Sequence, residues 1–79
     1  MDDTLEQFKE LGMSASFHFA DDTGSEWDLA YNDCNKAMEI YKKNPELQNE
    51  MREIAKKFLW SYDFKLRCEK LESDEINAR

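Results

Sequence analysis

The stretch SEWDLAYNDCNKAMEIYKKNPELQNEMREIAKKF (residues 25–58) decides the predicted fold, because apolar side chains recur in it at helical spacing. In residues 25–43 they form one stripe about 120° wide. The stripe consists of Trp27, Ala30, Tyr31, Cys34, Ala37, Met38 and Tyr41. Ser25 is expected to cap the start of this helix, and Lys42 and Lys43 suit the dipole at its end. We predict a helix over residues 25–43.

Asn44 and Pro45 are expected to end this helix and begin the next one. Proline disfavours helical geometry at the preceding residue, and it suits the first position of a helix that Asn44 caps. A connection this short makes the two helices antiparallel neighbours. The sequence therefore predicts an all-α fold built on an antiparallel hairpin of residues 25–43 and 45–72. The main apolar stripe of the second helix consists of Leu47, Met51, Ile54, Ala55, Phe58, Leu59, Tyr62 and Leu66.

The first twenty residues carry two different patterns. Residues 2–11 have acids at their start and apolar side chains on one face, which predicts a short helix that Gly12 ends and that packs across the hairpin. Residues 13–20 alternate apolar and polar side chains, which is the period of a strand. The sequence offers no second strand to pair with it, so we favour an extended connector over a strand that pairs with a second copy.

A second apolar stripe occupies the opposite side of the last predicted helix. It consists of Trp60, Phe64, Cys68 and Leu71. One helix over residues 45–72 would be about 42 Å long, whereas a compact domain of this size is about 30 Å across. Three arrangements would cover the stripe. The favoured one is a break near Ser61 or Asp63 that folds the chain back; the others pair two copies of the chain, or present Trp60, Phe64 and Leu71 to another protein.

The charge of the chain is unevenly distributed. Residues 1–39 hold ten Asp and Glu against two lysines, a net charge of −8, whereas residues 40–79 hold eight acids against nine Lys and Arg. This distribution favours basic partner surfaces and disfavours DNA, RNA and anionic membranes. We therefore expect no direct contact with nucleic acid or membrane.

Residue types that perform catalysis or bind metals are scarce. His18 is the only histidine, so no Ser–His–Asp or Cys–His set can be assembled, and we expect no enzymatic activity, metal or cofactor. The acids of DDTGSEWD (residues 21–28) miss the spacing of a calcium-binding loop. Cys34 and Cys68 lack CxxC spacing, so we expect two small buried apolar side chains.

The length of 79 residues suits one small helical domain spanning residues 1–79. The chain opens without the basic and apolar segments of a signal peptide, and it has no apolar run long enough to span a membrane. We expect a cytoplasmic protein.

These observations favour a small acidic binding module or inhibitor over an enzyme. Its acidic face would dock on a basic surface of a partner protein, such as a groove that otherwise holds nucleic acid, in the manner of phage-type antagonists and nucleic-acid mimics. The predicted face consists of Asp21, Asp22, Glu26, Asp28 and Asp33. The alternative is a structural subunit of a helical bundle that forms a homodimer through its C-terminal helix.

Overall fold

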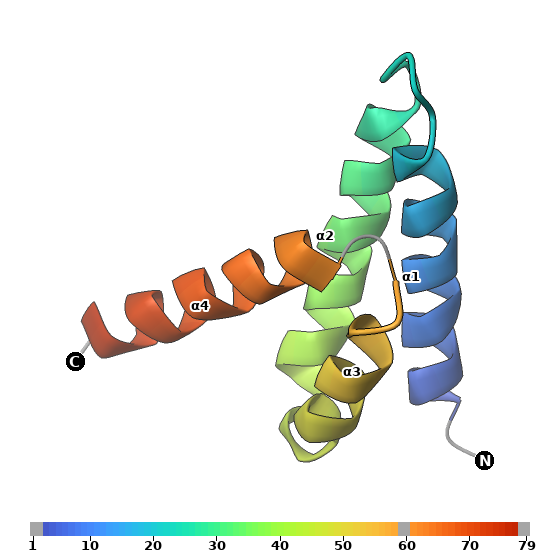
Figure 1. Cartoon of the computed structure of the whole chain (residues 1–79). Helices are drawn as coiled ribbons and strands as arrows, with labels where there is room; N and C mark the ends of the chain where they lie inside the picture. Colours follow the sequence, from blue (N-terminus) through green and yellow to red (C-terminus); the bar gives the residue numbers. More distant parts are fainter. Residues whose placement is uncertain (1–2, 59–60, 78–79) are drawn as a thin grey trace.

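The computed structural model describes residues 3–58 and 61–77, which are arranged as helices joined by short turns (Figure 1). The elements are α1 (Thr4–Phe19), α2 (Trp27–Lys43), the short 3-10 helix η1 (Pro45–Leu47), α3 (Gln48–Ala55) and α4 (Ser61–Asn77). No strand occurs among these residues. The prediction of an all-α fold is confirmed.

Helices α1 and α2 form a close antiparallel hairpin (Figure 1). Small residues line the seam between them, because Ala15 of α1 and Ala30, Cys34 and Ala37 of α2 are all completely buried. Small side chains let two helix backbones approach closely, and Phe8 then fills the wider space toward the other end of α1. The long antiparallel partner of α2 is therefore α1, rather than the segment that follows Pro45.

The extended connector or strand predicted for residues 13–20 is wrong, because α1 continues through them to Phe19. Gly12 is a buried residue inside this helix and does not end it. The three apolar residues of the alternation do not share one face. Phe17 is 72% exposed, whereas Ala15 and Phe19 lie one helical turn apart and pack with the core. A helix satisfies the backbone groups of this segment without any second strand.

The turn after α2 is as sharp as predicted, with Pro45 in the first turn of η1. Asn44 is the N-cap residue of η1, as predicted, but its side chain makes no capping bond there. Its Nδ2 donates to the carbonyl of Ile40 (2.8 Å) and so satisfies a group at the C-terminal end of α2. From this turn η1 packs on α2, while α3 crosses to α1.

The long helix predicted after Pro45 breaks, which is the favoured one of the three arrangements. Helix α3 ends at Ala55, and α4 begins at Ser61. Phe64 of α4 is only 3% exposed and meets Phe8 and Tyr41 edge-to-face, with ring centroids 5.5 and 5.4 Å apart. Phe64, Cys68 and Leu71 of the second apolar stripe therefore form the core-facing side of α4.

The break also corrects the main stripe. Leu66 was predicted to face the core, but it is 46% exposed because α4 is turned independently of α3. Met51, Ile54 and Ala55 of the main stripe lie on the inner face of α3, whereas the inner face of α4 is formed by residues of the second stripe. The core is nevertheless continuous, since it joins buried side chains from α1, α2, α3 and α4.

Helix α4 projects sideways from the hairpin, and α3 lies beside the end of the hairpin that is opposite the α1–α2 loop (Figure 1). The molecule is consequently flat, with extents of 41 × 34 × 18 Å. The end of the hairpin that carries residues 20–26 extends beyond α3 and α4.

Phe64→Ala and Leu66→Ala test this orientation of α4. Removing the buried ring should lower the free energy of unfolding by about 3–5 kcal/mol, whereas truncating the exposed leucine should change it by less than about 0.5 kcal/mol. Urea titrations followed by circular dichroism measure both values. Equal losses, or a larger loss for Leu66→Ala, would contradict the described packing.

Candidate functional site

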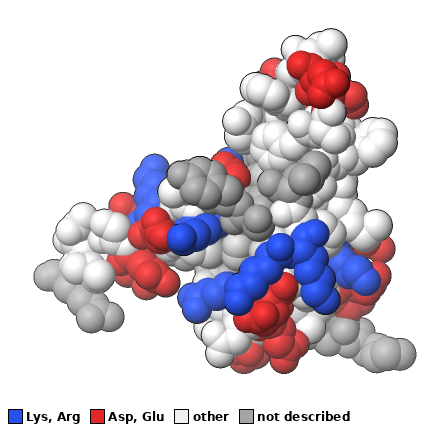
Figure 2. Space-filling view, viewed as in Figure 1, with Lys and Arg blue, Asp and Glu red and all other residues white. Residues whose placement is uncertain are grey.

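The projecting end of the hairpin, residues 13–33, is here called the apex. It contains all five acids of the predicted face and no lysine or arginine, because none occurs between Lys9 and Lys36. On the face shown in Figure 2, the charged side chains at the apex are acidic, whereas lysines and arginines lie over the lower part together with further acidic side chains. The structure therefore concentrates negative charge at one end of the molecule.

Asp21 organises the loop between α1 and α2. Its carboxylate accepts hydrogen bonds from Ser25 Oγ (2.8 Å), Thr23 Oγ1 (2.9 Å) and the backbone N–H groups of Thr23 (3.3 Å) and Glu26 (3.1 Å). The hydroxyl of Ser25, followed by that of Thr23, lowers the pKa of Asp21 to about 2. Asp21 thus remains ionised and holds the entry to α2.

This arrangement corrects the predicted N-cap. Ser25 directs its hydroxyl to Asp21, and the capping position of α2 falls on Glu26, with no side-chain capping bond. The sequence pattern identified the right turn and assigned the wrong residue to it. An aspartate that accepts hydrogen bonds from backbone N–H groups at the start of a helix satisfies these donors as a capping serine would.

The loop is tightened further by Gly24 and Trp27. Gly24 adopts φ 77°, a left-handed conformation that favours glycine. The indole of Trp27 packs beside Gly24, and its Nε1 donates to the carbonyl of Asp21 (3.2 Å). The start of α2 is therefore fixed against the end of α1.

Two of the predicted acids join the helices instead of facing outward. Glu26 Oε1 lies 3.0 Å from His18 Nδ1, and Asp33 Oδ2 accepts a hydrogen bond from Ser14 Oγ (2.6 Å). Asp22 and Asp28 are exposed. The structure brings all five acids to one end of the molecule, but three of them also hold the apex together.

Aromatic side chains share the apex with these acids. Phe19 meets Tyr31 edge-to-face at 5.2 Å between ring centroids, and Trp27 lies one helical turn before Tyr31. Trp27 and Tyr31 are 45% and 43% exposed. Both belong to the stripe predicted to face the core, because the pattern of a stripe carries no signal of where a covering helix ends.

The other predicted contact set consists of Trp60, Phe64 and Leu71. Trp60 lies outside the described residues, Phe64 is buried in the core, and Leu71 is half-buried against it. Docking through Phe64 would require α4 to leave the hairpin.

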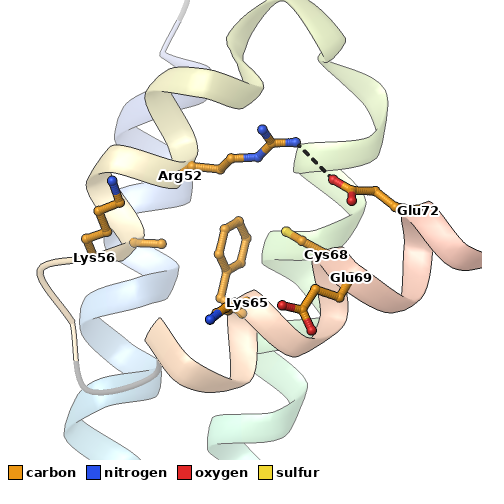
Figure 3. A pocket seen from close by; sticks show the side chains of 8 residues that line it. Arg52, Lys56, Lys65, Cys68, Glu69 and Glu72 are labelled. Carbon is orange, nitrogen blue, oxygen red and sulfur yellow. Dashed lines mark ion pairs between the residues drawn. The ribbon is translucent and has the colours of Figure 1, made fainter.

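A cavity of about 500 Å³ lies between α3 and α4 (Figure 3). Arg52 spans its rim, with Nη2 3.6 Å from Glu72 Oε1 and Nε donating to Tyr41 Oη (2.9 Å). Burial raises the pKa of the Cys68 thiol, which opposes formation of a nucleophilic thiolate. His18 lies in the apex and pairs with Glu26, so it supplies no base to this cavity.

Both cysteines are free thiols buried in the core, as expected. Among residues 3–58 and 61–77, no group of three or more His, Cys, Asp or Glu side chains could hold a metal ion. No helix in that part of the chain has the length and apolar character needed to cross a bilayer.

Comparison with known proteins adds no functional clue, because no protein family, curated protein or solved structure matches this chain. The candidate site is therefore judged by its geometry and charge. On those grounds the apex is the best candidate, since it combines exposed carboxylates with exposed aromatic rings on a fixed frame.

Asp21→Asn tests the role of the Asp21 carboxylate. At near-neutral pH the variant should melt at a lower temperature than the wild type, because the amide would turn a donor toward the N–H of Glu26. The stabilisation that the ionised Asp21 carboxylate gives the wild type is fully present above the ordinary pKa of 3.8. It is lost as the pH falls through the lowered pKa of about 2. Thermal melts at several pH values measure it. Asp22→Asn is the matched control, and an equal effect of both variants would contradict this role.

Proposed function

We propose that this protein is a non-enzymatic docking module whose apex binds a basic surface on a partner protein. The segregation of charge carries the proposal, since residues 13–33 hold five carboxylates and no lysine or arginine. The projection of the apex beyond α3 and α4 supports it, because a protruding end can enter a concave surface.

The exposed acids would act mainly on the rate of association. Asp22 and Asp28 face solvent at the tip, where their field attracts cationic surfaces over about one Debye length, roughly 8–10 Å at moderate salt. A rigid apex also lowers the entropic cost of binding, because its loop is already ordered by Asp21.

A groove that normally binds nucleic acid is the kind of basic surface that best fits this proposal. Such a groove presents closely spaced Lys and Arg side chains, and an acidic protein that occupies it excludes the nucleic acid. Like charge disfavours direct binding of the apex itself to DNA, RNA or anionic lipid. We place this docking in the cytoplasm, as the sequence analysis does.

Asp22→Lys combined with Asp28→Lys tests the proposal. Each change is worth two charges, so the variant moves the net charge from −7 to −3. Affinity capture from extracts of the native host should recover partners with the wild type at about 50 mM NaCl and lose them at about 500 mM. The variant should lose them at both concentrations.

Asp74→Lys combined with Glu75→Lys is the matched control, because it makes the same change of net charge at the exposed end of α4. It should retain capture. A partner that remains bound at high salt and binds the apex variant equally well would refute the electrostatic mechanism. Circular dichroism establishes that each variant is folded.

Self-association through α4 is the second candidate. The projecting helix exposes Leu66 and also Ile76, which is 67% exposed. Apolar side chains on a protruding helix can pair with the same helix of a second copy. This candidate uses a different face from the one predicted, since Phe64 points into the core.

Leu66→Ser combined with Ile76→Ser tests the second candidate. If the chain forms a homodimer through this face, the wild type should show twice the monomer mass in light scattering, and the variant should show the monomer mass. A monomeric wild type at high protein concentration would remove this candidate.

A further inference from the structure

We infer that the aromatic shelf of the apex, defined as the exposed rings of Trp27 and Tyr31, receives arginine side chains from a basic segment of the partner protein. This inference rests on the proposed docking function and specifies the chemistry of its partner. Three observations carry it: the rings are exposed, their positions are fixed, and the charge around them is negative.

The exposed rings are held in place by their own neighbours. Trp27 is fixed by its bond from Nε1 to the carbonyl of Asp21 (3.2 Å) and by its packing beside Gly24. Tyr31 of α2 packs edge-to-face against Phe19 of α1, with 5.2 Å between the ring centroids. Rings fixed in this way offer flat faces to a ligand with little loss of side-chain entropy on binding.

No described helix covers the shelf. Helix α4 meets α2 one turn after Tyr31, where Arg67 Nη1 donates to Asn35 Oδ1 (2.7 Å). Beyond that contact α2 continues toward the apex with Tyr31 and Trp27 on its surface. Neighbouring exposed aromatic rings on the surface of a helix are typical of an interaction site.

The surrounding charge selects a cationic ligand. Asp28 follows Trp27 directly, and Asp22 lies in the adjoining loop, so carboxylates border the shelf at its outer end. No lysine or arginine occurs between Lys9 and Lys36, so that segment offers no cation of its own to pair with these carboxylates.

Arginine suits this surface better than lysine does. Its planar guanidinium stacks on aromatic faces while its N–H groups bind carboxylates in pairs, whereas the lysine ammonium is a compact and strongly hydrated charge. The chain already contains one such contact at its core end, where Arg52 Cζ lies 5.8 Å from the centroid of the Tyr41 ring.

Charge also decides against the other occupants of an aromatic surface. A second copy of the chain would bring two acidic apices face to face, and like charges opposed across an interface are strongly disfavoured. Nucleic acid could stack its bases on the rings, but its phosphates would meet the same carboxylates.

Two probe peptides test the inference by isothermal titration calorimetry. One is a capped peptide in which every third residue is arginine, and the other is the same peptide with lysine. The wild type should bind the arginine peptide about tenfold more tightly than the lysine peptide. The indole N–H resonance of Trp27 should shift on addition of the arginine peptide.

Trp27→Leu and Tyr31→Leu keep apolar bulk and remove the aromatic faces. Each should weaken binding of the arginine peptide by about threefold and leave binding of the lysine peptide unchanged. Phe17→Leu is the matched control, because Phe17 is an exposed aromatic of α1 outside the shelf. Tyr31→Leu remains informative if Trp27→Leu disturbs the loop, since Tyr31 lies within α2 and outside the loop of residues 20–26.

The outcomes separate this inference from the proposed function. Equal, salt-sensitive binding of both peptides, unaffected by Trp27→Leu and Tyr31→Leu, would overturn the aromatic contact and leave electrostatic docking standing. No binding of either peptide at low salt would overturn both. Tighter binding of a single-stranded oligonucleotide than of the arginine peptide would also overturn the inference.

Discussion

The packing of Phe64 against Phe8 and Tyr41 is the contact on which the rest of the structure depends. It joins α4 to both helices of the hairpin through two edge-to-face aromatic pairs. Tyr41 extends the same connection to α3, because its hydroxyl accepts a hydrogen bond from Arg52 Nε. A chain of this length buries only about 60% of the surface that its unfolded form exposes, so each large buried ring matters to its stability.

This contact lies toward one end of the hairpin, and its position divides the molecule in two. The core end holds α3, α4 and the mixed charges, including the pairs of Arg67 with Asp63 and of Lys56 with Glu53. The apex holds the unbalanced acids and the exposed rings. Under the proposed function, stability and binding would depend on different parts of one short chain, so a binding surface could exist without weakening the core.

Polar contacts order the apex beyond its base, where Ala15 and Ala30 are completely buried. Asp21 binds the loop hydroxyls and backbone, and the pairs of His18 with Glu26 and of Ser14 with Asp33 join α1 to α2. Acids that would repel one another if they all faced solvent are partly used as hydrogen-bond acceptors. The same residue type therefore supplies both the negative field and the rigidity of the surface that carries it.

The sequence by itself determined the helical class, the α2 span, the sharp turn at Asn44 and Pro45, and the acidic character of residues 21–33, because helical periodicity, proline geometry and charge are local properties. It led to errors at residues 13–20 and at Leu66. The pattern of residues 13–20 fitted the period of a strand as well as that of a helix, and the pattern around Leu66 did not fix which side of its helix faces the core. Only packing chose between these alternatives. Which end of the α2 stripe stays exposed was likewise decided by the tertiary structure alone. The position of α4 depends on Phe64 reaching Phe8 across more than fifty residues of chain, and no local pattern specifies a contact of that range.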